Sequence, residues 1–250
     1  MATDEVAIVD ADFTLVENVE TLTGSTAAMA VNATIGGEAA QAGISTVTFV
    51  DTAAATDNLT VASGFSSALT VNLDAGAVNT VDASAFTKAL TVATSNDVLN
   101  DATHVLKGGS DSDILSITVD NAAAANASGI EDFETIQTVL AAGGFKWTSH
   151  DNNVDSGNTQ TINATSLDDD VLTFNGSAEN DGNFIINVNS TGNHVVTLGN
   201  GNDQYTSTGL TADDNVTATA GNNTINVGAG ANTVTGGTGN DTIIGGAGID

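Results

Sequence analysis

The last part of the chain, Ala218–Asp250, divides into nines that read ATAGNNTIN, VGAGANTVT, GGTGNDTII and an incomplete GGAGID. Glycine occupies the fourth place of every nine, and Asp or Asn occupies the sixth. A branched aliphatic residue holds the eighth place of each complete nine, at Ile225, Val234 and Ile243. A flexible Gly/Asn-rich linker keeps no aliphatic residue at a fixed period, so this pattern predicts ordered, stacked repeats.

Each place in the nine has a physical task. Glycine lets the chain turn through positive φ and brings carbonyl groups close to an ion. The Asp side chain supplies the hard anionic oxygen that a calcium ion requires among its oxygen ligands. The last three places form a minimal strand whose aliphatic residue points inward. One nonapeptide buries almost no apolar surface, so the repeats must stack to share a core.

Further copies precede this block. NSTGNHVVT (189–197), LGNGNDQYT (198–206) and GLTADDNVT (209–217) follow the same register, with Gly192 and Gly201 in the fourth place and Asp203 and Asp214 in the sixth. GGSDSDILS (108–116) stands apart with Asp111 in the fourth place. An acidic turn before a strand is the alternative interpretation of the isolated copy. The predicted calcium ligands are Gly108, Gly109, Asp111, Asp113, Gly199, Gly201, Asp203, Asp214, Asn223, Asn232, Gly236, Gly237, Gly239, Asp241, Gly245, Gly246, Gly248 and Asp250. Asn223 and Asn232 lack the charge of Asp but keep a carbonyl oxygen, whereas His194 in the sixth place is a poor calcium ligand.

Composition narrows the class of protein. The chain has 31 acidic residues and three basic ones, Lys88, Lys107 and Lys146, for a formal net charge of −28. This charge excludes nucleic acid and an anionic membrane surface as electrostatic partners. It also repels itself in a compact state unless cations neutralise it. Because 40% of the residues are hydrophobic and Pro is absent, we expect an ordered fold that needs cations.

The sequence carries few other signals. There is no Cys, which excludes disulfides and thiolate metal sites. The start, MATDEVAIVDADF, is not a secretory signal, and no apolar run is long enough to cross a bilayer, so we expect no membrane insertion. The last nine is incomplete, so we expect this chain to be a fragment of a longer protein.

Short strand-like segments fill the first hundred residues. They are VAIV (6–9), VETL (19–22), VTFV (47–50), LTVAS (59–63), LTVNL (69–73), NTVDAS (79–84) and LTVAT (90–94). Val, Thr, Ile and Leu dominate them, as in strands, and their shortness suits the coils of a solenoid. We therefore expect an all-β fold: a right-handed parallel β-helix of irregular coils, about 20 residues each, over 1–178. It continues into a calcium-binding β-roll over 179–250, apparently truncated.

Two segments interrupt this pattern. GIEDFETIQTV (129–139) reads as a turn that runs into a strand, with Glu131 and Glu134 at the coil end. GFKWTSH (144–150) contains the only Trp of the chain. We expect this Trp to cap the core where regular strands pause; an adhesive patch is the alternative.

The nonapeptides resemble the RTX family, whose GGxGxDxUx pattern GGTGNDTII matches at every defined place. The single GGxxxD motif, followed by a strand and then by G-I-E-x-x-E-T-I (129–136), resembles bacterial RTX-type surface-layer proteins. VENVETLTG (16–24) repeats the E-T-L ending. The resemblance implies calcium-filled parallel β-helices, type I secretion and assembly into lattices.

We find no catalytic constellation. His104, His150 and His194 lie in Asn/Asp/Thr-rich surroundings without HExxH or GxSxG. Ser149, His150 and Asp151 are adjacent, but neighbours in a strand point to opposite faces. We therefore expect no enzyme.

The leading hypothesis is a structural, calcium-stabilised segment of a bacterial surface layer or extracellular matrix, which folds and self-assembles into a lattice or filament outside the cell. The alternative is a binding module, either an adhesin stalk or an ice-binding solenoid. Thr238 and Asn240 resemble the outward Thr/Asn pair of ice-binding repeats, but that pair does not recur in the other coils.

Overall fold

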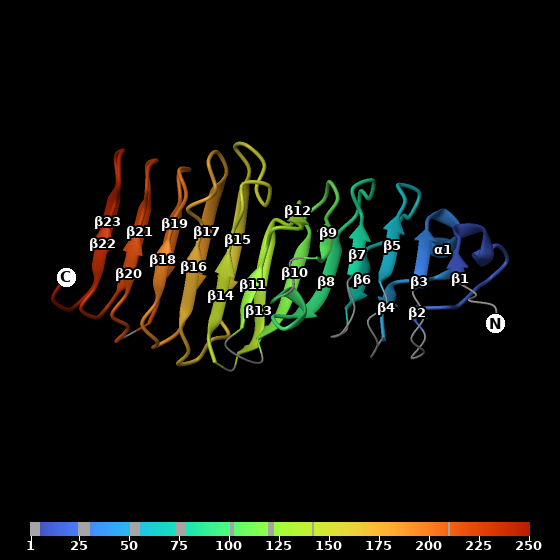
Figure 1. Ribbon diagram of the computed structural model, residues 1–250, viewed down its shortest axis with the longest axis horizontal. Helices are drawn as coiled ribbons and strands as arrows, with labels where there is room; N and C mark the ends of the chain where they lie inside the picture. Colours follow the sequence, from blue (N-terminus) through green and yellow to red (C-terminus); the bar gives the residue numbers. More distant parts are fainter. Residues whose placement is uncertain are drawn as a thin grey trace.

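The computed structural model is a rod in which the chain winds from one end to the other in successive parallel coils (Figure 1). It describes residues 6–24, 31–50, 56–73, 79–100, 103–119, 123–141, 143–209 and 211–250. The expectation of an all-β fold of stacked parallel strands is confirmed.

Three parallel sheets run along the rod. Sheet B, with eleven strands, spans its whole length. Its strands are β2 (Thr21–Thr23), β4 (Thr46–Thr48), β6 (Leu69–Asn72), β8 (Leu90–Ser95), β10 (Ile114–Val119), β13 (Thr135–Ala141), β15 (Thr159–Ala164), β17 (Asn183–Val188), β19 (Gln204–Ser207), β21 (Thr224–Gly228) and β23 (Thr242–Gly245).

The other strand of each coil belongs to sheet A in the first half and to sheet C in the second. Sheet A contains β1 (Val6–Ile8), β3 (Val31–Ile35), β5 (Asp57–Val61), β7 (Asn79–Asp82), β9 (Val105–Lys107) and β12 (Ile130–Glu131). Sheet C contains β11 (Ala124–Asn126), β14 (Phe145–Thr148), β16 (Leu172–Asn175), β18 (Val195–Thr197), β20 (Asn215–Thr217) and β22 (Thr233–Thr235). The exchange takes place in one coil, which holds β11, β12 and β13.

In the described ranges, helical structure is confined to short pieces. Two 3₁₀ turns, η1 (Asp10–Phe13) and η2 (Val98–Asn100), and the one-turn helix α1 (Gly37–Ala42) lie in the first half. The sequence did not predict α1. The Asp10 carboxylate stabilises its start by accepting N–H groups from Gly36 at 2.7 Å and Ala39 at 2.9 Å. Burial raises the pKa of Asp10, but these hydrogen bonds outweigh it, so the net pKa is lowered.

One hydrophobic core extends through most of the rod, because every second residue of a strand points inward. Phe65 and Phe86 meet edge-to-face with ring centroids 5.8 Å apart. Trp147 lies inside regular strand β14, 1% exposed, with its ring 5.9 Å from that of Phe145. It is therefore a core residue, and the expectation of a cap at a pause between strands is wrong.

The coils shorten toward the C-terminus. Register partners Ala33 and Leu59 are 26 residues apart, whereas Val216 and Val234 are only 18 apart. A step of 18 residues equals two nonapeptides per coil. The earlier coils are longer than the expected 20 residues because their turns carry additional residues.

Candidate metal centre

The turns between strands form two edges of the rod. At the first edge the chain passes from sheet A or C to sheet B, and at the second it passes from sheet B to the next coil. Successive nonapeptides alternate between the edges, because each supplies one turn and one strand. The predicted ligands at the first edge are Gly108, Gly109, Asp111, Asp113, Gly199, Gly201, Asp203, Asn223, Gly236, Gly237, Gly239 and Asp241. Those at the second edge are Asp214, Asn232, Gly245, Gly246, Gly248 and Asp250.

The sixth-place residues of the first edge form a ladder of hydrogen bonds between coils. Oδ1 of Asp203 accepts the backbone N–H of Phe184 at 2.8 Å. Oδ1 of Asn223 accepts the N–H of Asp203 at 2.9 Å, and Oδ1 of Asp241 accepts the N–H of Asn223 at 2.9 Å. Asp113 of the isolated copy follows the same rule with Leu90, at 2.8 Å. Each side chain therefore satisfies a backbone donor of the preceding coil.

The second edge repeats this arrangement. Oδ1 of Asp214 accepts the N–H of His194 at 3.0 Å, and Oδ1 of Asn232 accepts that of Asp214 at 2.8 Å. Oδ1 of Asp250 accepts the N–H of Asn232 at 3.3 Å. His194 joins the ladder through Nδ1, which accepts the N–H of Leu172 at 3.0 Å. Histidine fits this place because a neutral imidazole offers one acceptor nitrogen.

Fifth-place residues form a second ladder that points the other way. Oδ1 of Asn183 accepts the N–H of Asn202 at 2.7 Å, and Oδ1 of Asn202 accepts that of Asn222 at 2.8 Å. Oδ1 of Asn222 in turn accepts the N–H of Asn240 at 2.8 Å. Here the side chain receives a donor from the following coil rather than the preceding one. Side chains at adjacent places thus bind each coil to both of its neighbours.

The fourth-place glycines stack directly on one another. Gly221 and Gly239 adopt φ values of 91° and 132°. A Cβ atom on Gly221 would lie 1.8 Å from the carbonyl oxygen of Gly201, and one on Gly239 would lie 1.9 Å from that of Gly221. Only glycine therefore permits this separation between coils.

The second carboxylate oxygen of several ladder residues faces its own turn. Oδ2 of Asp241 lies 2.5 Å from the position that a Cβ of Gly236 would take, and Oδ2 of Asp250 lies 2.1 Å from that of Gly245. Oδ2 of Asp203 is buried and has no hydrogen-bond partner among the described residues. Glycine thus leaves room beside carboxylate and carbonyl oxygens, the hard donor set that Ca²⁺ prefers. These residues fit calcium.

Burial raises the pKa values of two carboxyl groups at the first edge, those of Asp203 and Asp113. Burial is the main cause for Asp203, opposed by N–H groups of Phe184 and Gly199 and reinforced by the charge of Glu179, and the pKa reaches about 6. Burial also raises the pKa of Asp113 to about 6, although N–H groups of Gly109 and Leu90 lower it. A cation beside these carboxylates favours their charged form.

The second polar atom of two sixth-place residues already has hydrogen-bond partners within the protein. Oδ2 of Asp214 accepts the phenol of Tyr205 at 2.9 Å. Nδ2 of Asn223 donates to the carbonyl oxygens of Ala220 at 3.0 Å and Gly236 at 3.2 Å, and to Oδ1 of Asp241 at 3.1 Å. These three oxygens surround an amide nitrogen, so Asn223 supplies its own donor where Asp would leave them to a cation.

The sequence analysis missed equivalent residues in the first half. Oδ1 of Asp57 accepts the N–H of Val31 at 2.7 Å, and Nδ1 of His104 accepts that of Asn79 at 3.1 Å. Asp57, Asn79 and His104 are all buried. They lack the glycine pattern, but a polar residue at the start of an apolar triplet, as in DNLTV and NTVD, was a usable signal.

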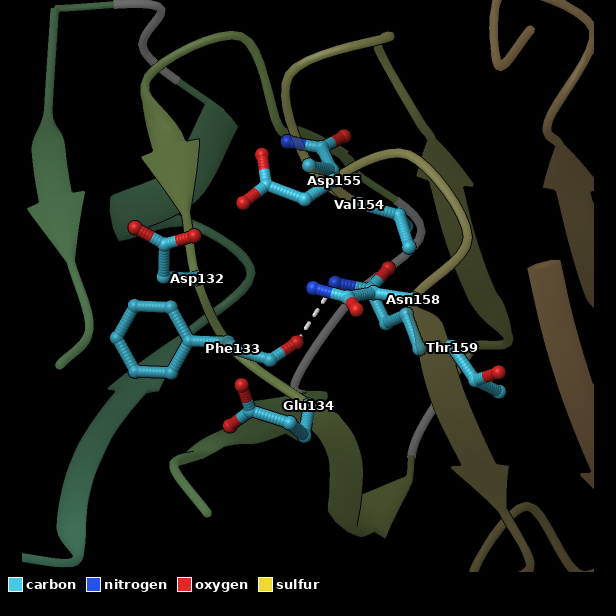
Figure 2. A pocket seen from close by; sticks show the side chains of 9 residues that line it. Asp132, Phe133, Glu134, Val154, Asp155, Asn158 and Thr159 are labelled. Carbon is cyan, nitrogen blue, oxygen red and sulfur yellow. Dashed lines mark hydrogen bonds between the residues drawn. The ribbon is translucent and has the colours of Figure 1, made fainter. Parts of the chain in front are cut away.

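An acidic hollow of about 230 Å³ opens at the first edge between the turns before β13 and β15 (Figure 2). Asp132, Glu134 and Asp155 line it. Burial raises the pKa of Asp132, and the charge of Asp155 adds to the effect. Asp132 also has φ of 58°, unusual for a residue other than glycine.

Within the described ranges one salt bridge forms, between Lys107 and Glu131 at 2.7 Å.

The nonapeptides also match a known family. The model of the RTX calcium-binding nonapeptide repeat, in four copies, matches residues 208–243 and 217–250. No curated protein and no solved structure matches the chain. The match covers five of the turns that contain predicted ligands, and the turns at 108–113 and 198–203 lie outside it.

Proposed function

Since residues 208–250 carry RTX calcium-binding nonapeptide repeats, which bind Ca²⁺, we propose that the chain is a structural segment of a bacterial surface layer or extracellular matrix. It folds on calcium binding outside the cell and then self-assembles. The observation that carries this proposal is the pair of edges, where side-chain oxygens of Asp and Asn in successive coils lie stacked beside glycine turns.

The charge of the chain supports a folding role for calcium. A net charge of −28 opposes compaction, and one salt bridge among the described residues offsets little of it. Bound calcium supplies positive charge to the stacked carboxylates. The sixth-place side chains hold the coils in register, so cation binding and coil stacking stabilise the same state.

Folding that depends on calcium suits a protein exported by type I secretion, a route typical of RTX proteins. The chain stays unfolded where calcium is scarce and folds where it is plentiful. In the described part of the chain no helix is both long and apolar enough to cross a membrane.

The test is folding and assembly on calcium addition. Far-UV circular dichroism should show a disordered spectrum in chelator and a β-rich spectrum in millimolar calcium, and electron microscopy should then show filaments or sheets. An unchanged β-rich spectrum in chelator contradicts the folding role. Folded single rods at high protein concentration contradict self-assembly and indicate a stalk.

A further inference from the structure

A cluster of three carboxylates lies at the first edge, outside the residues that match the RTX repeat. Oxygen atoms of Asp151, Glu179 and Asp181 lie within 4.8 Å of one another. Asp151 belongs to the turn between β14 and β15, and the other two belong to the turn between β16 and β17. The cluster therefore joins two consecutive coils.

Glu179 is the unusual member, because it is fully buried, with 0% exposure. Its Oε1 accepts the N–H groups of Gly182 at 2.9 Å and Asp181 at 3.2 Å. Its Oε2 is buried and has no hydrogen-bond partner among the residues that the structure describes. A buried carboxylate oxygen without a donor is unfavourable unless a cation satisfies it.

Several earlier coils fill the same place with an apolar residue, whereas the turn after β14 closes through the buried Asn153. The N–H of Glu179 closes a turn by donating to the carbonyl of Gly176 at 3.0 Å. Phe65, Phe86 and Ile130 close the corresponding turns of earlier coils in the same way, and all three are buried. Core packing thus accepts Phe or Ile here, so packing alone does not explain a glutamate.

No lysine neutralises the cluster. The chain has three lysines and no arginine, and the one ion pair between described residues joins Lys107 to Glu131. Asp151 is instead oriented by neutral donors of Asn180. Its Oδ1 accepts the backbone N–H of Asn180 at 3.0 Å and the side-chain Nδ2–H of Asn180 at 2.9 Å.

We propose that the carboxylates of Asp151, Glu179 and Asp181 bind a hard divalent cation of the Ca²⁺ class. Its three residues lie outside the predicted ligands of the nonapeptides, and Glu179 borders the Gly199–Asp203 turn of the next coil. A cation here joins the turn that follows β14 to the turn that follows β16. Glu179 supplies a buried ligand oxygen, Oε2, that bulk water does not reach.

Terbium, a luminescent analogue of calcium, reports on this site because Trp147 is the only Trp and lies four residues before Asp151. The nearest predicted glycine turn on the C-terminal side, Gly199–Asp203, follows β18, two strand spacings from β14, or roughly 10 Å along the rod. Energy transfer falls steeply with distance, so selective excitation of Trp147 favours the proposed site. Calcium should displace the terbium.

The variants Glu179→Gln and Asp181→Asn should each weaken Trp-sensitised terbium binding at least about tenfold. Asp169→Asn is the matched control: it removes the charge of an exposed residue in the acidic run 168–170, at the other edge of the coil, and terbium binding should stay unchanged. Asp181 is exposed, so its variant remains informative if Glu179→Gln does not fold, which circular dichroism in calcium establishes.

Unchanged emission in Asp181→Asn, or in folded Glu179→Gln, overturns the proposal. Equal loss in Asp169→Asn also overturns it, because terbium then senses general negative charge. Neither result affects the proposed role of the nonapeptides, whose calcium-dependent folding is measured by circular dichroism.

Discussion

At the scale of single residues, the sixth place of the nonapeptide combines two tasks. One atom of the side chain always accepts a backbone N–H from the preceding coil, whether the residue is Asp203, Asn223 or His194. The second polar atom differs, and it decides whether the turn can receive a cation. The residue type therefore changes metal binding without changing the stacking of the coils.

The variant Asn223→Asp tests this division. At the lowest calcium concentration that keeps the unchanged chain folded, it should lower the free energy of unfolding by about 1–3 kcal/mol, because the Nδ2 donor to three oxygens is lost and a charge is added between Asp203 and Asp241. In calcium it should bind additional Ca²⁺. Unfolding curves and isothermal titration calorimetry measure the two effects.

Asn222→Asp is the matched control for that variant. It adds the same charge one residue earlier and keeps the Oδ1 acceptor, as Asp213 already does for the N–H of Ala231. Calcium stoichiometry should not rise in this control. If both variants gain an ion, charge rather than position is responsible.

His194 predicts a pH effect. Burial lowers its pKa from the ordinary 6.5, opposed in part by the charge of Asp214, and Nδ1 must stay unprotonated to accept the N–H of Leu172. Its stabilising contribution is therefore present above pH 6.5 and is lost as the pH falls, because the unfolded state then binds the proton.

The variant His194→Asn should remove this dependence, since Asn keeps an acceptor. Below pH 6 the difference in free energy of unfolding between the two proteins should change by up to about 1.4 kcal/mol per pH unit. Chemical unfolding in calcium between pH 5 and 8, as a rough range, measures it. Parallel pH profiles contradict a neutral role for His194.

Single residues also set the limit of the sequence analysis. Asp203 and Asp241 could be placed at the turns because the period fixes the sixth position. Glu179 and Asp151 could not, because their neighbourhood depends on turns of unequal length, which bring together residues 28 apart in sequence. Trp147 was misplaced because a single aromatic residue carries no periodicity.

At the scale of the coil, the separation between turns is set by glycine. The variant Gly239→Ala should lower the free energy of unfolding by at least about 2 kcal/mol more than Gly157→Ala. Both glycines have positive φ, but a Cβ on Gly239 would collide with the carbonyl of Gly221, whereas a Cβ on Gly157 meets no atom within 4 Å. Urea unfolding in calcium compares them, and equal losses would mean that stacking is not the cause.

The elements were predictable where apolar triplets alternate with turn residues. The segments around β5, β6, β7 and β8 were identified within a few residues. Strand β3 was missed although Val31, Ala33 and Ile35 alternate with polar residues, and helix α1 was missed because GEAAQA has little apolar character. Helix α1 depends on Asp10, which lies 26 residues before Gly36, and a contact of that range leaves no local pattern.

At the scale of the whole molecule, calcium dependence should vary along the rod. The coils of the second half that match the RTX repeat bury small residues such as Val216 and Ile225, whereas earlier coils bury Phe65 and Phe86. A larger apolar area stabilises a coil without metal. The division of the chain at residue 178 remains a prediction; the structure changes from sheet A to sheet C earlier, at β11 and β12.

Hydrogen exchange measures this gradient. As chelator is titrated in and calcium becomes limiting, amides of β20–β23 should lose protection before those of β5–β10, and added calcium should restore it. Apolar burial gives the earlier coils their resistance, so a peptide from β7 serves as the internal reference. Simultaneous loss along the whole rod would instead show that the coils unfold as one cooperative unit.

The opposed ladders give the rod a direction. Each coil offers fifth-place oxygens toward one end and sixth-place oxygens toward the other, so its two faces are complementary rather than alike. Copies that continue this bonding must join head to tail. A filament built that way is polar, because its two ends expose different faces, and the two ends would grow at unequal rates.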